Sequence, residues 1–154
     1  PRDFTTYVPT AMAIKIETSE APTIDGDISD AVWAKAQAIE EFYQLDPDTG
    51  QPGSERTVLR FLYDANNLYV SVYAYDRQPD RIVATNKGRD GQIFVDDTVR
   101  LYLDPLNTRR NAYYFEMNAL GARADRIETV TVDSVFNWLA RSGLAERGPT
   151  LVAL

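Results

Sequence analysis

Short segments in which apolar and polar residues alternate recur along this chain, and turn residues separate them. A period of two residues places alternate side chains on opposite faces of a sheet, so each segment has one face for a core. Five or six such segments predict an all-β fold, an antiparallel, jelly-roll-like β-sandwich. The expected strands lie at 11–18, 57–63, 68–75, 98–103, 112–118 and 123–132.

One short helix is expected between the first two strands. Asp25-Gly26 is a turn dipeptide, and Ser29 is a favourable N-cap, which predicts a helix over 29–39. Ile28 and Trp33 would then hold the two positions of a hydrophobic staple. Trp33 is therefore expected in the core.

The chain after residue 132 has a different character. Residues 133–142 predict an amphipathic helix, and the last five residues are mostly apolar. We expect one domain with a β-sandwich over 1–132 and a helical docking tail over 133–154. The candidate docking residues of this tail are Phe136, Leu139, Leu151, Val152 and Leu154.

Composition excludes several classes of function. The formal net charge of -7 argues against nucleic acid and against anionic lipid headgroups as partners. The chain has no cysteine and no histidine, so disulfides, thiolate chemistry and histidine-based triads are excluded. No apolar run reaches the length of a membrane span. The chain begins at Pro1, which predicts an N-terminus processed by signal cleavage or by Met removal. Signal cleavage would give the periplasmic or extracellular location that we expect.

Carboxylates offer the main candidate chemistry. Asp96-Asp97 could be a catalytic pair, a strand-end turn or part of a cation site. Adjacent strand residues point to opposite faces, so the pair cannot converge on one substrate, and no catalytic residue is predicted. Calcium prefers carboxylate and carbonyl oxygens, so a structural calcium ion is the one cofactor considered. Its candidate ligands are Asp25, Asp27, Asp96 and Asp97.

Tyrosines mark a candidate ligand or partner face. Tyr69, Tyr73 and Tyr75 alternate along one predicted strand, opposite its apolar side. Tyrosine combines a flat apolar ring with a polar tip, which suits protein interfaces and sugars alike. The alternative is that these tyrosines form the second, half-buried face of a strand in the sandwich and bind no ligand. Tyr102 and Trp138 are the other candidates for this face.

Four motifs occur in one order along residues 12–130, and together they resemble family 9 carbohydrate-binding modules and their DOMON-like relatives. The variant that they resemble most lies at the N-terminus of large bacterial envelope proteins. The motifs are Ile24-Asp25-Gly26-Asp27 with Val32-Trp33, Leu62-Tyr63-Asp64 with Leu68-Tyr69-Val70, Asp96 to Pro105, and Tyr113-Tyr114-Phe115 with Asn118 to Gly121 and Asp125.

The resemblance implies a β-sandwich that stacks sugars on tryptophan, with a structural calcium in some members. The chain departs from the family pattern after residue 130. In this part, the chain has no clear counterpart of the aromatic residue that binds sugar near the end of the domain in family members. A missing strand there would leave an open sheet edge.

These features predict a non-catalytic, extracytoplasmic interaction module. The main prediction is a structural or accessory subunit docked on a larger protein complex, such as one at the periplasmic face of a membrane. The alternative is a carbohydrate-binding module that recognises glycans through exposed aromatics. A haem-binding role lacks the histidine or cysteine that axial ligation uses. Expected partners are protein subunits or carbohydrate, with neither nucleic acid nor a direct membrane span.

Overall fold

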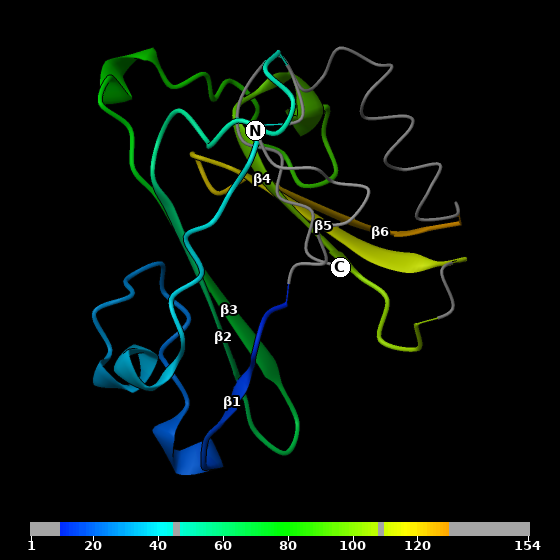
Figure 1. The fold of residues 1–154 in the computed structure, drawn as a ribbon. Helices are drawn as coiled ribbons and strands as arrows, with labels where there is room; N and C mark the ends of the chain where they lie inside the picture. Colours follow the sequence, from blue (N-terminus) through cyan, green and yellow to red (C-terminus); the bar gives the residue numbers. More distant parts are fainter. Residues whose placement is uncertain (1–9, 45–46, 108–109, 130–154) are drawn as a thin grey trace. The chain divides into compact units, whose positions relative to one another are not determined.

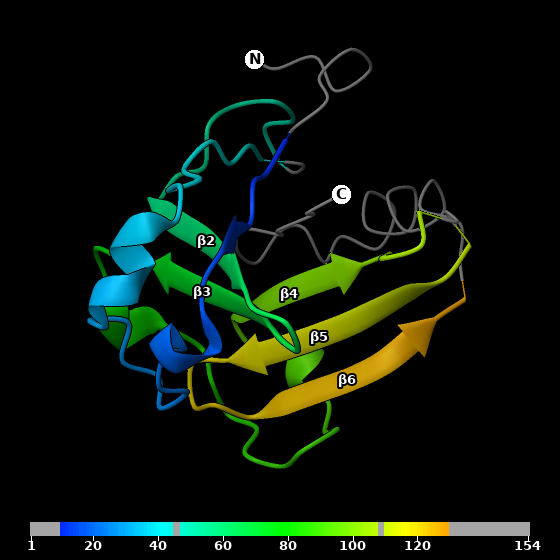
Figure 2. The same cartoon turned by 90° about the horizontal axis from the view of Figure 1, so that it is seen from below.

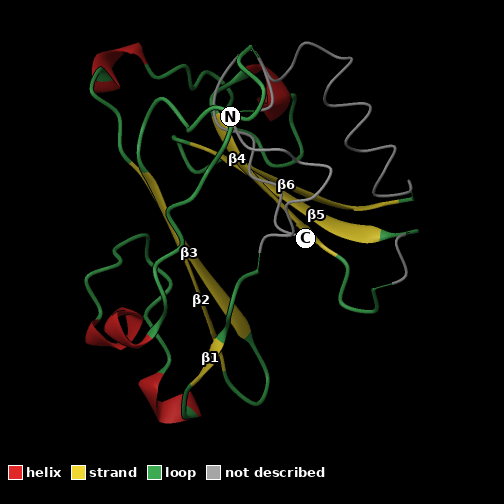
Figure 3. Cartoon of the chain, in the orientation of Figure 1, coloured by secondary structure: helices red, strands yellow, loops and turns green. Residues whose placement is uncertain are grey.

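The computed structural model describes residues 10–44, 47–107 and 110–129. Within these ranges, six strands form two three-stranded sheets, and four short 3₁₀ helices lie between them (Figures 1 and 3). This strand-rich content confirms the β-rich prediction. The described residues form two compact units: the β1–β3 unit holds residues 10–41 and 55–76, and the β4–β6 unit holds the described residues of 42–54 and 77–129. The packing of the two sheets as a sandwich stays a prediction.

The first sheet is built around a hairpin. Strand β2 (Thr57–Tyr63) pairs antiparallel with β3 (Leu68–Ala74), which confirms the predicted hairpin. Asp64 closes the turn because its Oδ1 accepts the backbone N–H of Asn66 at 2.7 Å and of Asn67 at 2.8 Å. These hydrogen bonds hold the pKa of Asp64 below its usual range, and the bond from Asn66 contributes most.

The third strand of this sheet corrects one expectation. Strand β1 (Ile14–Lys15) is two residues long and pairs parallel to β2, not antiparallel. A parallel pair needs a long crossover, and the segment between the two strands supplies it. This crossover contains both 3₁₀ helices of the unit, η1 (Thr18–Glu20) and η2 (Ala31–Lys35).

The helix predicted over 29–39 is the single 3₁₀ helix η2, so the predicted length and type were wrong. Its N-cap is Asp30, not Ser29, and no side chain caps it. The turn before it explains the difference. Asp27 Oδ1 accepts the N–H of Ser29 at 2.9 Å, which satisfies Ser29 within the turn instead of at a helix start.

Trp33 lies in the core, as predicted. Its side chain packs with Ile16, Ala36 and Leu62, all of which are buried, against one face of the first sheet. Ile28 packs against this cluster from outside, so the two residues of the predicted staple lie in one cluster. The 3₁₀ segment therefore acts as the cover of this sheet face.

The second sheet is an antiparallel meander in the order β4-β5-β6, visible in Figure 2. Its strands are β4 (Thr98–Leu103), β5 (Ala112–Asn118) and β6 (Arg123–Glu128). Strands β4 and β5 have the predicted bounds, and β6 starts where predicted. Two 3₁₀ helices, η3 (Pro79–Arg81) and η4 (Ile93–Val95), precede the sheet, and Ile93 is fully buried against Ala122 and Ala124.

The burial of the second sheet differs from the prediction. The alternation in β4 gives Val99, Leu101 and Leu103 as the apolar face for a core, yet they are only half-buried, and the most buried residue of β4 is Arg100. Arg100 is tolerated there because Glu116, directly opposite in register, pairs with it. The predicted tail over 133–154, with its docking residues, lies outside the described residues, as does Trp138.

Candidate functional site

A shallow, open cleft of about 420 Å³ lies on one face of the β1–β3 unit. One wall consists of residues between Ile28 and Ala34, and it includes part of η2. The other wall consists of residues of β2 and β3 and of the positions just outside these strands. The side chains that give the cleft its chemistry are Asp30, Trp33, Arg56, Arg60, Tyr73 and Tyr75.

Tyr73 and Tyr75 form the aromatic part of the cleft. Their side chains are 47% and 44% exposed, and their ring centroids lie 4.6 Å apart with the planes tilted by 56°. The guanidinium of Arg56 lies 4.7 Å from the centroid of the Tyr75 ring, a cation–π distance. The N–H of Tyr75 donates to the carbonyl of Arg56 at 2.8 Å, which extends the hairpin beyond Ala74.

Arg56 is held in place by Glu40. Its Nε lies 3.1 Å from Oε2 and its Nη2 lies 2.7 Å from Oε1, a bidentate pair. The hydrogen bond from Arg56 keeps the pKa of Glu40 below its usual range. The charge of Arg56 is therefore already matched by a carboxylate.

Arg60 differs from Arg56. It is half-buried on the cleft face of β2, between Val58 and Leu62, and it makes no hydrogen bond or ion pair with any residue that the structure describes. Its register partner on β3 is Ser71, a neutral residue. The carboxylate of Asp30, also on the cleft, accepts the backbone N–H of Thr23 at 3.2 Å.

Two buried polar groups on this face have no partner within the described part of the chain. The indole Nε1 of Trp33 and the hydroxyl of Ser71 belong to side chains that are 6% and 3% exposed, and neither makes a hydrogen bond. Unsatisfied buried groups cost free energy and are uncommon in folded proteins. Their position beside Arg60 makes this face polar beneath its aromatic rim.

The structure brings together only part of the predicted tyrosine face. Tyr73 and Tyr75 share the cleft, but Tyr69 is half-buried, and its hydroxyl donates to Asp64 Oδ2 at 2.9 Å. Tyr102 belongs to the β4–β6 unit, where the centroid of its ring lies 4.9 Å from that of the Tyr114 ring.

The four predicted calcium ligands are divided between the units. Asp25 and Asp27 lie in the turn before η2, where Asp25 Oδ1 accepts the N–H of Asp27 at 2.9 Å. Asp97 Oδ2 accepts the N–H of Val83 at 2.7 Å. No group of three or more acidic, histidine or cysteine side chains that could hold a metal occurs among residues 10–44, 47–107 and 110–129. The calcium site stays a prediction.

Asp96 is the centre of a buried network at the start of β4. Its Oδ1 accepts the N–H of Thr85 at 3.0 Å and the Thr85 hydroxyl at 2.7 Å, and its Oδ2 accepts Asn118 Nδ2 at 2.8 Å and the N–H of Asn86 at 3.1 Å. Burial acts to raise the pKa of Asp96, but these donors together hold it far below its usual range. The geometry is that of the strand-end alternative.

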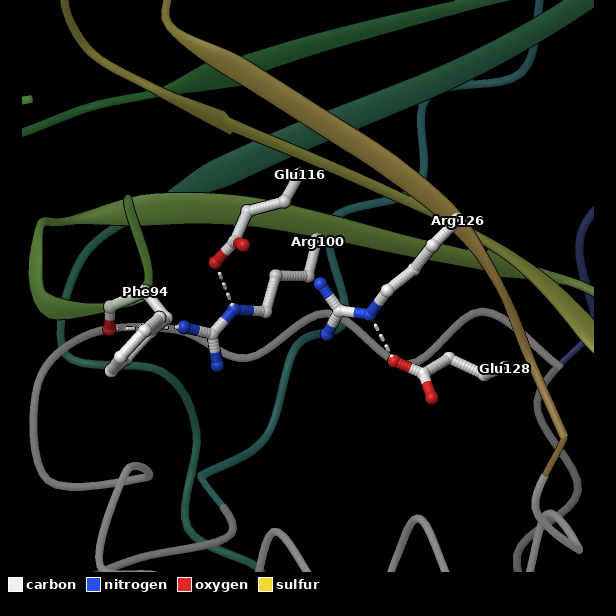
Figure 4. Close-up of polar contacts among 5 residues, drawn as sticks. All are labelled: Phe94, Arg100, Glu116, Arg126 and Glu128. Carbon is white, nitrogen blue, oxygen red and sulfur yellow. Dashed lines mark hydrogen bonds and ion pairs between the residues drawn. The ribbon is translucent and has the colours of Figure 1, made fainter. Parts of the chain in front are cut away.

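The β4–β6 unit carries a second polar cluster, drawn in Figure 4. Arg100 Nε donates to Glu116 Oε1 at 2.7 Å, and its Nη2 donates to the carbonyl of Phe94 at 3.2 Å. Arg126 pairs with Glu128, and its guanidinium lies 4.0 Å from the centroid of the Tyr114 ring. Every charge in this cluster has an opposite partner, so it is a structural network.

Sequence reasoning missed Arg56 and Arg60 as cleft residues and treated Trp33 as core alone. One signal for Arg60 was present. It interrupts the apolar positions Val58 and Leu62 on the inner face of a predicted strand. A charged residue at such a position is uncommon unless it is paired or exposed to a ligand.

A family model described as carbohydrate family 9 binding domain-like matches residues 24–147. Neither the comparison with curated proteins nor that with solved structures found a match. Among the described residues, no helix is long and apolar enough to cross a membrane. The family match covers most of the chain and all six residues that shape the cleft chemistry. The chain therefore belongs to the carbohydrate family 9 binding domain-like family.

Proposed function

We propose that this chain is a carbohydrate-binding module and that the cleft lined by Tyr73 and Tyr75 is its ligand site. The observation that carries the proposal is this exposed aromatic pair beside two arginines, in a family of carbohydrate-binding domains. Sugars present apolar C–H faces and hydroxyl edges. A site that combines flat rings with fixed donors and acceptors matches both.

Each wall of the cleft has a separate role in this proposal. The ring of Tyr73 or Tyr75 packs against the apolar face of one sugar residue. Arg56, held by Glu40, donates to sugar hydroxyls without a large loss of side-chain freedom. Asp30 accepts hydrogen bonds from hydroxyls at the opposite wall.

The family match supports carbohydrate binding better than the docking role that was the main prediction. The docking tail over 133–154 lies outside the described residues, so it lends the docking role no structural support. The binding role needs no catalytic group. We retain the extracytoplasmic location as a proposal, since extracellular glycans are the ligands that such a module would meet there.

Tyrosine substitution tests this function. We expect the double variant Tyr73→Ala and Tyr75→Ala to weaken oligosaccharide binding roughly tenfold or more, because aromatic contacts of about 0.5–1.5 kcal/mol each are lost. Isothermal titration against a panel of oligosaccharides measures this change.

The matched control is Tyr63→Ala, because Tyr63 is 39% exposed at the end of β2 and faces the other side of the same sheet. This variant should bind like the parent protein. Equal losses in the control and the double variant, or unchanged binding in the double variant, would place the ligand elsewhere. Absence of binding to every saccharide by the parent protein would refute the function itself.

A further inference from the structure

The two arginines of the cleft differ in how their charges are paired. Arg56 is neutralised by its bidentate pair with Glu40. Arg60 has no hydrogen-bond or ion-pair partner among the described residues, although it is half-buried. Arginine stays protonated at any physiological pH, so Arg60 is a fixed positive charge with which no described carboxylate pairs directly.

None of the described residues around Arg60 forms a hydrogen bond or ion pair with its guanidinium. Ser71, opposite in register, is neutral, and Trp33 can only donate a hydrogen bond. The charge of Arg60 acts on Glu40, whose pKa is lowered first by its hydrogen bond from Arg56 and also by the charge of Arg60. Both oxygens of Glu40 are already bound to Arg56, which leaves Arg60 able to bind a further anion.

The position of Arg60 relative to the aromatic pair limits the size of the ligand group. Val58 is opposite Tyr73, and Arg60 is opposite Ser71, so Arg60 and Tyr73 are diagonal neighbours across the strand pair. Such neighbours are roughly 7–8 Å apart. One sugar residue stacked on Tyr73 would thus place a ring substituent within reach of the Arg60 guanidinium.

We propose that the ligand of this cleft is an acidic saccharide, with the carboxylate of a uronic acid residue bound by Arg60 and the same sugar stacked on Tyr73. This inference rests on the proposed carbohydrate-binding function. A neutral sugar would leave Arg60 without a counter-charge. A simple anion without hydroxyls would meet Asp30 without giving it a hydrogen-bond donor. A uronic acid residue satisfies both groups, and guanidinium matches carboxylate in a bidentate geometry.

The net charge of -7 does not oppose this local attraction. At physiological ionic strength, charges farther than about 8 Å from the ligand are largely screened. The cleft residues therefore decide the sign of the field that the ligand meets.

The test compares oligouronides with their carboxyl-reduced counterparts, which have the same linkages but no charge. We expect the parent protein to bind at least one of the tested oligouronides more tightly than the carboxyl-reduced form of the same oligosaccharide, by about tenfold or more. Arg60→Gln should abolish this preference, so that the two forms bind with similar affinity. The affinity of the parent protein for the oligouronide should also fall as salt is raised.

Arg123→Gln is the matched control, because Arg123 is an exposed arginine of the β4–β6 unit and its loss changes the net charge equally. This variant should keep the preference. Tighter or equal binding of the reduced form would overturn the acidic ligand and leave the carbohydrate function standing. Absence of binding to either form would refute both. A preference that survives Arg60→Gln, or equal Arg60-dependent binding of a sulfated saccharide without uronic acid, would overturn the assignment of a carboxylate to Arg60.

Discussion

At the scale of single residues, Asp96 shows how a carboxylate can be structural while resembling a functional group. It is 4% exposed, and both oxygens accept hydrogen bonds from the chain. A carboxylate surrounded by donors in this way is stabilised in its charged form. Its pKa lies below the usual value of about 3.9, so the group has a pH-dependent effect on stability.

We expect the ionised form of Asp96 to stabilise the fold, so that stability decreases at acidic pH. The folded state binds the proton of Asp96 more weakly than the unfolded state, so the stabilisation is fully present above about pH 4 and is lost as the pH falls below that value. Asp96→Asn should lower the unfolding midpoint at pH 7 by roughly 5–10 °C and flatten the dependence on pH below 4. Thermal unfolding from pH 7 to pH 2 measures both effects. Asp80→Asn, at an exposed position, should change neither.

The tyrosines in and next to β3 show that the sequence pattern predicts the face of a side chain, whereas its neighbours determine its exposure. Tyr73 and Tyr75 were predicted as candidates for a ligand or partner face, and the structure exposes the side chains of both. Tyr69 has the same position in the pattern, but its hydroxyl is bound by Asp64 across the hairpin turn. The alternation gives only the face of a side chain, and a polar partner at the turn is not visible in it.

At the scale of elements, strand periodicity was a reliable guide, and helix signals were not. Strands β2, β4 and β5 have the predicted bounds, because alternation over six or seven residues is a strong signal. The capping pattern near Ser29 was misleading. In the turn at Asp25–Asp27, carboxylates accept the N–H groups of Asp27 and Ser29, and a 3₁₀ helix of five residues begins after Asp30 instead of a longer helix at Ser29.

The ion pair between β4 and β5 is the element-scale contact with the largest expected effect. The side chains of Arg100 and Glu116 are 8% and 2% exposed. Glu116→Leu should cost about 3–5 kcal/mol of unfolding free energy, because it leaves the Arg100 charge buried without a partner. The double variant Arg100→Met with Glu116→Leu should recover most of this loss. Denaturant titration of the three proteins measures the difference.

The pair of Arg126 and Glu128 in Figure 4 is the matched control, since the side chains are 52% and 26% exposed. Glu128→Leu should cost less than about 1 kcal/mol, as solvent-exposed pairs do. If the double variant were as unstable as Glu116→Leu alone, the loss would come from packing or from other hydrogen bonds, and the ion-pair explanation would be wrong.

At the scale of the whole molecule, ligand binding should appear as added stability. A ligand that binds only the folded state at 100 times its dissociation constant stabilises that state by about 2.7 kcal/mol. The cleft belongs to the β1–β3 unit, so we expect the gain in the calorimetric transition that unfolds this unit. An oligosaccharide that binds in titration but leaves every transition unchanged would contradict a site built by folded residues.

The sequence by itself determined the β-rich class, the family and the position of most strands, because these depend on local alternation and on motifs in order along the chain. It also placed Trp33 in the core and Tyr73 and Tyr75 on one face of a strand. Only the tertiary structure decided that β1 joins its sheet parallel and that Arg56 is neutralised by Glu40 while Arg60 is not. These contacts join segments that are far apart in sequence, and electrostatic pairing depends on distances in space that no local pattern contains.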